Sequence, residues 1–427
     1  MIHSGETFLL DTSGTQILGG PGGAPVSTQS VKTGRVFVRD LTIEKGGVLR
    51  AMGPYPLRIC ASGDVTIRGL LNADGFDAHD VVTLNTGSIP ERGGPGGPGG
   101  GRGGDSSTRV KRSTPAGSFG RGPIEGQYGG GGGESSYAPA ALGKDARRPG
   151  GGGRFAADVD PTRWGLFAEA GFPGHSLGTG ALTGSSPAPG GVAGTGPFVD
   201  GDPDNDFFGI RAIPDPVTGT VRLVRGELDH LQGGYGCGGG GDAIPASMFP
   251  PMNWTSAHDE KGGAGGGGGG AVHIRALGRI VFGNEGRISA VGGQGGLGEN
   301  TMLLDHIGGT GGSGSGGMIV LETATQIDFT DGDPTTTPSR KALFARGGRR
   351  KTGGSNPFGT PIPPNVSYSG TGGPGLIQIH LPLRGQTPSF TDPNAALVLP
   401  AAAMFSPDPL GEVSSPTAIE LLPGVDG

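Results

Sequence analysis

The sequence predicts an all-β fold: a short parallel β-solenoid (β-helix) with a large glycine-rich, polyglycine-II-like lobe formed by inserts from one corner. Three observations lead to this fold. Apolar and polar residues alternate in several short segments, these segments recur along the chain, and long glycine-rich stretches separate them. Alternation with a period of two is typical of strands with one buried face, and its recurrence is typical of stacked coils.

The alternation is clearest in residues 56–75 and 271–293. Apolar and small residues occupy odd positions in the first segment and even positions in the second. They are Leu57, Ile59, Ala61, Val65, Ile67, Leu71 and Ala73, and then Val272, Ile274, Ala276, Ile280, Phe282, Ile288 and Ala290. Alanine and glycine fall where a tight corner leaves no room for a large side chain. Each segment is therefore predicted to form one coil of three short strands.

Weaker copies of the pattern occur at 36–53, 317–347 and 375–381. One coil cannot bury its inner face alone, so about three or more must stack to form a core. The residues expected to share this core include Ile59, Ile274, Ile319 and Ile377.

Glycine accounts for 95 of the 427 residues and proline for 37, a share that is otherwise typical of low-complexity chains. Charged residues make up only 16%, fewer than solvated disordered segments normally carry. The copies end in Ala-x-Gly at Ala73, Ala290 and Ala345, and the next copy follows a run of glycines. The inserts are therefore expected to leave and re-enter the solenoid at one corner.

Gly-Gly-X triplets occur in these inserts at 93–98, 292–297 and 308–313. They favour left-handed helices with three residues per turn, which bond to neighbouring chains through their backbones. We expect one ordered lobe beside the solenoid, and a set of flexible glycine linkers is the alternative.

These patterns divide the chain into five parts. They are an N-terminal arm (1–35), the first coils (36–75), the glycine-rich insert lobe (76–270), the later coils with shorter inserts (271–382) and a C-terminal extended strap (383–427). Residues 6–18 are apolar enough to form a strand that pairs with another subunit, because the open end of a solenoid is an unpaired edge.

The formal net charge of −6 gives no footprint for nucleic acid, and no apolar run approaches the ~18 residues of a membrane span. Cys60 and Cys237 lie far apart and fit no metal or redox pattern. They either form a disulfide or remain free thiols.

Asp200, Asp202, Asp204 and Asp206 place carboxylates at every second residue of one segment. Ca²⁺ is bound by several oxygens from one flexible loop, so these four residues are the candidate calcium ligands. The segment lacks the EF-hand pattern, and a solvated acidic loop is the alternative.

Histidine stands beside aspartate at four places. They are His79-Asp80, Asp229-His230, His258-Asp259 and Asp305-His306. A metal or acid–base cluster is one interpretation. Capping of backbone groups at the ends of glycine helices is favoured, because it needs no convergence of the four pairs. No nucleophile or phosphate-loop motif stands in its structural context, so no catalytic residue is predicted.

The combination of coils and glycine runs, as in residues 265–296, resembles the glycine-rich β-helical surface proteins of bacteria. The glycine segments are similar to the polyglycine II sandwich of phage tail-fibre tip adhesins and of snow-flea antifreeze proteins. These resemblances concern architecture, cover roughly half of the chain and transfer no functional residue.

The resulting expectation is a non-enzymatic structural or adhesive protein of an extracellular, cell or virion surface. It would self-associate into a filament or other surface assembly, or join a larger particle, and glycans are candidate ligands. The alternatives are a phage tail-fibre-type receptor-binding adhesin, a polysaccharide-active β-helix enzyme and an ice-binding protein. Ice binding ranks last because the inserts offer no regular face of threonine or alanine.

Overall fold

The computed structural model describes residues 1–19, 25–31, 33–80, 91–106, 120–122, 231–241, 262–298, 309–331, 342–349, 370–373 and 375–381, together with short strands outside these ranges. Within this part of the chain every regular element is a strand, and no helix suited to crossing a membrane is found.

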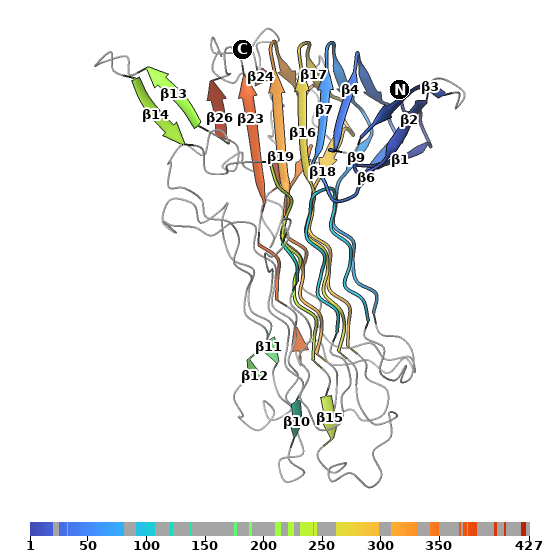
Figure 1. Cartoon of the computed structure of the whole chain (residues 1–427), viewed down its shortest axis with the longest axis vertical. Coiled ribbons are helices and arrows are strands. Elements are labelled where there is room, and N and C mark those ends of the chain that lie inside the picture. The colour runs from blue at the N-terminus through green and yellow to red at the C-terminus, as the bar shows by residue number, and fades with distance from the viewer. Residues whose placement is uncertain are drawn as a thin grey trace.

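Most strands belong to three parallel sheets (Figure 1). The first sheet contains β4 (Arg35–Val38), β7 (Leu57–Ala61), β16 (Ala271–Ala276), β19 (Met318–Thr323), β23 (Leu376–Leu381) and β26 (Glu420–Pro423). The second contains β5 (Leu41–Ile43), β8 (Val65–Ile67), β17 (Ile280–Phe282), β20 (Ile327–Asp328) and β24 (Leu397–Val398). The third contains β1 (Thr7–Asp11), β6 (Val48–Met52), β9 (Leu70–Asn72), β18 (Arg287–Ser289), β21 (Leu343–Phe344) and β25 (Phe405–Ser406).

Successive strands of the chain pass through the three sheets in turn. The coil β7–β8–β9 pairs with the coil β16–β17–β18, which pairs in turn with β19–β20–β21, and every pairing between them is parallel. This β-solenoid-like arrangement confirms the predicted all-β class and the predicted stacking of parallel strands.

Side chains on the inner face form ladders from coil to coil. In the first sheet Ile274 is paired with Ile59 on one side and with Leu321 on the other. In the third sheet Ile288 lies between Leu71 and Leu343. One hydrophobic cluster contains these residues, and Ile59, Ile274, Ile319 and Ile377 all belong to it, as the alternation predicted. The core is therefore a single column inside the three sheets.

Strands of both terminal regions continue this stack. β1, in the predicted arm, pairs with β6 of its own chain, and Leu10 enters the core. β1 is thereby the end strand of the third sheet, and the expectation that this segment pairs with another subunit stays a prediction. β24, β25 and β26, in the predicted strap, extend the second, third and first sheets.

The remaining strands form four small sheets. They are the hairpin of β2 (Thr15–Gly19) and β3 (Pro25–Ser30), the parallel pair of β10 (Ser136–Ala138) and β15 (Ala243–Pro245), the sheet of β11 (His175–Ser176), β12 (Ala188–Pro189) and β22 (Ser367–Tyr368), and the hairpin of β13 (Ile210–Pro214) and β14 (Val221–Arg225).

Three long inserts leave the stack after a strand of the third sheet and return to a strand of the first sheet. The exit residues Ala73, Ala290 and Ala345 are fully buried. Each alanine carbonyl accepts a hydrogen bond from a returning glycine: Gly270 N–H to Ala73 at 2.7 Å, Gly317 N–H to Ala290 at 2.8 Å, and Gly375 N–H to Ala345 at 2.6 Å. The same closure in three coils explains why the sequence repeats Ala-x-Gly at the exits and glycine at the returns.

Candidate functional site

Described segments of the inserts lie together beside the corner where the inserts leave the stack, and residues 262–270 lie among six other segments. Their N–H groups donate to the carbonyls of three of these segments. Gly263, Gly266 and Gly269 donate to Gly309, Gly312 and Ser315, respectively. Gly265 and Gly268 donate to Gly104 and Gly101, and Gly267 and Gly270 donate to Phe76 and Ala73. Their carbonyls accept from three more, at Gly94 and Gly97, at Gly234, Cys237 and Gly240, and at Gly293 and Gly296. The period of three residues is that of the polyglycine II backbone.

Close backbone contact requires glycine in this segment. A Cβ atom on Gly266 would lie 2.2 Å from the carbonyl oxygen of Gly293, far inside van der Waals contact. In Figure 1 the described insert segments run side by side away from the sheets.

Three aspartates join residues 74–80 to residues 291–297. Their Oδ1 atoms accept backbone N–H groups: Asp74 from Val291 at 2.7 Å, Asp77 from Gln294 at 2.6 Å and Asp80 from Leu297 at 2.8 Å. In return, Gly75 and Ala78 donate their N–H groups to the carbonyls of Val291 and Gln294 at 2.8 and 2.9 Å. In a chain with three residues per turn, a spacing of three places all three carboxylates on one side. We call this set the aspartate ladder.

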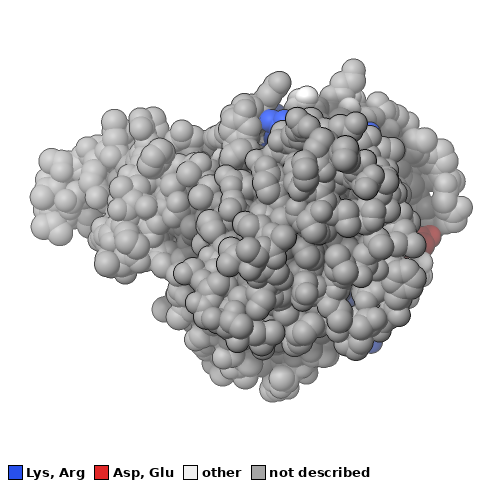
Figure 2. Space-filling model, turned by 90° about the horizontal axis from the view of Figure 1, so that it is seen from below, with Lys and Arg blue, Asp and Glu red and all other residues white. Residues whose placement is uncertain are grey.

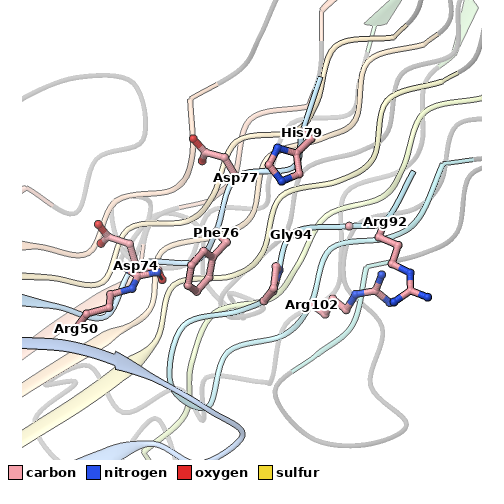
Figure 3. Close-up of a pocket in the computed structure, with 11 residues that line it drawn as sticks. Arg50, Asp74, Phe76, Asp77, His79, Arg92, Gly94 and Arg102 are labelled. Carbon is pink, nitrogen blue, oxygen red and sulfur yellow. Dashed lines mark hydrogen bonds between the residues drawn. The ribbon is translucent and has the colours of Figure 1, made fainter. Parts of the chain in front are cut away.

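A pocket of about 760 Å³ lies beside the aspartate ladder, at the corner of the stack (Figure 3). Strand β6 and two insert segments, 74–79 and 92–102, supply its walls. Its lining side chains are Arg50, Asp74, Phe76, Asp77, His79, Arg92, Pro95 and Arg102, with glycine backbone at Gly75, Gly93 and Gly94.

The inner wall is fixed by Arg50 and Asp74. The guanidinium of Arg50 lies 4.2 Å from the centre of the Phe76 ring, and it donates to the side chain of Asn72 and to the carbonyl of Asp74. Burial lowers the pKa of Arg50. Burial also raises the pKa of Asp74, although the Ser289 hydroxyl and the Val291 N–H both donate to its carboxylate. Arg50 and Asp74 therefore use their hydrogen-bonding groups within the protein, and their side chains shape the pocket.

The outer rim carries the accessible charges. Arg92 is exposed and forms no ion pair or hydrogen bond within the described part of the chain. Arg102 forms an ion pair with Asp105, and Asp105 also accepts the N–H of Gly93 at 2.9 Å. Arg92 and Arg102 line the pocket from the segment 92–102, whereas Asp77 and His79 line it from the segment 74–79 (Figure 3). The pocket is therefore lined by two arginines from one segment and by a carboxylate and an imidazole from another.

Most of the site residues predicted from the sequence lie outside the described residues. Asp200, Asp202, Asp204 and Asp206 are among these, so the calcium prediction stays a prediction. The same holds for three of the four His–Asp pairs, those at 229–230, 258–259 and 305–306. In the fourth, Asp80 accepts the backbone N–H of Leu297 and His79 lines the pocket, and the interpretation as caps stays a prediction.

The described residues hold no group of three or more His, Cys, Asp or Glu side chains that could bind a metal ion. Both cysteines are free thiols, with Cys60 partly exposed on the first sheet and Cys237 buried among the glycine segments.

The aspartate ladder was not predicted from the sequence. Its signal is the spacing of Asp74, Asp77 and Asp80 within residues 73–80. The arginines of the rim leave no such pattern.

Figure 2 views the molecule from the end towards which the glycine segments run. In this view the few visible charged side chains of the described residues lie mainly near the outline of the molecule. No family model, curated protein or solved structure matches this chain. Its function is therefore inferred from its geometry.

Proposed function

We propose that the glycine-rich inserts form one ordered, polyglycine-II-like lobe and that the chain is a structural or adhesive protein of an extracellular, cell or virion surface. The observation that carries this proposal is the bonding of residues 262–270 to six neighbouring segments with a period of three. Backbone groups satisfied in this way stiffen a chain that contains few large side chains.

A stiff lobe suits such a role because it holds its far end away from the stack. In Figure 1 the described insert segments extend side by side from the sheets, away from the stack. Filament subunits and adhesins both present a surface at a distance from an anchor. The same observation favours, as a second candidate, a receptor-binding adhesin of the phage tail-fibre type.

Self-association is the expected form of assembly. β1 and β4 are the end strands of the third and first sheets. Their outer faces carry Leu9 and Phe37, whose relative exposures are 57% and 59%. End strands with exposed apolar residues invite pairing with another chain. A second copy that pairs with these two end strands would place its own side chains next to Leu9 and Phe37.

The experiment compares matched apolar-to-charged substitutions. The double variant Leu9→Glu and Phe37→Glu places charge at the end of the stack, and Leu277→Glu places it at a side chain of similar exposure, 60%, between β16 and β17 in the middle of the stack. We expect sedimentation velocity and electron microscopy to show assembly for the wild type and Leu277→Glu but not for the double variant. A wild type that stays monomeric at high concentration contradicts the assembly, and equal assembly of all three forms contradicts this interface.

A further inference from the structure

The charged side chains around the pocket differ in how fully they are bonded to the rest of the protein. Asp74 directs Oδ1 to Ser289 and Val291, and Asp77 directs Oδ1 to Gln294. Arg50 is held by Asn72 and by the Asp74 carbonyl. The exposed guanidinium of Arg92 has no partner in the described part of the chain, and Arg102 lines the same pocket (Figure 3). The rim therefore carries a positive charge, on Arg92, that no ion pair in the described structure neutralises.

The wall formed by residues 74–79 restricts what these cations can hold. Asp77 is exposed and makes no second hydrogen bond in the described structure, and His79, which lines the same pocket, is exposed as well. The carboxylate of Asp77 would repel a ligand that carries negative charge over its whole surface. A ligand with one anionic end and a neutral, hydroxyl-bearing body would place its charge at Arg92 and its hydroxyls at Asp77 and His79.

We propose that this pocket binds an acidic saccharide through its carboxylate, with Arg92 and Arg102 on the carboxylate and Asp77 and His79 on the sugar hydroxyls. The planar guanidinium matches a carboxylate through paired N–H donors. The volume of about 760 Å³ lies within the range of sites that enclose a small organic ligand and is far larger than a bare anion requires. This inference rests on the proposed adhesive function, because it names the ligand class of that role.

The test is isothermal titration calorimetry on the full chain with three probes. These are a trimer of galacturonic acid, the neutral galactose trimer and inorganic phosphate. We expect binding of the acidic trimer and at least about tenfold weaker binding of the other two. The neutral trimer lacks the carboxylate that forms charge-assisted hydrogen bonds with arginine, and phosphate lacks the hydroxyl-bearing body that Asp77 and His79 would bind.

Variants locate the binding site. Arg92→Gln is expected to weaken binding of the acidic trimer about tenfold or more without changing the melting temperature, because Arg92 is exposed and unpaired. Arg39→Gln is the matched control: its side chain is 90% exposed, and Arg39 does not line the pocket. It is expected to bind like the wild type.

Three results overturn the inference: no binding of the acidic trimer, equal binding of phosphate, or unchanged binding by Arg92→Gln. If any of these occurs while the chain still assembles, only the ligand assignment fails. If the chain does not assemble but the acidic trimer binds through Arg92, only the assembly fails.

Discussion

The carboxylate of Asp77 accepts the backbone N–H of Gln294 at 2.6 Å across 217 residues of sequence. Asp74 and Asp80 bind Val291 and Leu297 across the same separation. The two segments therefore keep one register over two turns of a three-residue repeat. An aspartate at every third position selects one neighbour among many similar glycine segments, which backbone bonding alone does not do.

Replacing Asp77 tests this relationship. Asp77→Ala leaves the Gln294 N–H without its acceptor, and we expect a loss of about 1 kcal/mol of local stability. Asp77→Asn keeps an oxygen acceptor and is the matched control. Hydrogen exchange in residues 291–297 should be faster in the alanine variant and close to wild type in the asparagine variant. Equal exchange rates in the two variants would show that the side-chain bond does not hold the segment.

Alanine substitutions distinguish glycines required by close packing from glycines required by backbone conformation. Gly266→Ala places a Cβ atom 2.2 Å from the Gly293 carbonyl, so the segments must separate, and we expect a loss of about 3 kcal/mol or more. Gly5 has a φ of +79° with nothing within 4 Å of an added Cβ, so Gly5→Ala should cost only the roughly 1–2 kcal/mol of a left-handed backbone conformation. Thermal unfolding followed by circular dichroism compares the two, and equal losses would contradict close packing.

The two cysteines should differ in reactivity. Burial raises the pKa of the Cys237 thiol, whereas Cys60 is partly exposed. We expect a disulfide reagent to titrate one thiol in the native protein and two after denaturation. The Cys60→Ser variant, as control, should show no rapidly reacting thiol while native. Rapid reaction of both native thiols would contradict the burial of Cys237, and failure to find two after denaturation without reductant would indicate a disulfide.

The sequence predicted the solenoid well because each strand carries its own evidence. Apolar residues occupy the odd positions around Ile59 and the even positions around Ile274, whichever strand each of these pairs with. The inward-facing residues could therefore be predicted before the pairing was known. The common corner was readable for a similar reason, since Ala73, Ala290 and Ala345 precede the inserts in the same way.

The pocket and the aspartate ladder could not be predicted in this way. Asp74 acquires its partner Val291 only when an insert of nearly 200 residues returns to the stack in the correct register. Glycine has no side chain, so its sequence does not state which segments become neighbours. Arg50, on strand β6, and Arg92, in an insert, share no local pattern, and only the fold brings them to one pocket.

Asp74 should make stability depend on pH. Burial raises its pKa above the ordinary value of 3.8, so the folded protein takes up a proton at a higher pH than the unfolded chain does. The free energy of unfolding should therefore increase as the pH falls through the raised folded value towards 3.8, and the charged carboxylate should weaken the fold above that window.

Asp74→Asn keeps an oxygen for the Ser289 and Val291 donors but carries no charge. Although it loses the attraction to Arg50, the raised pKa means that desolvation outweighs the groups that favour the charge. We expect Asp74→Asn to unfold at a higher temperature than the wild type near neutral pH, and the difference to shrink on acidification. Melting curves between roughly pH 4 and 8 measure this, with Asp77→Asn as the control for an amide in the same ladder. A constant difference between Asp74→Asn and the wild type across that range would show that the Asp74 carboxyl does not couple folding to pH.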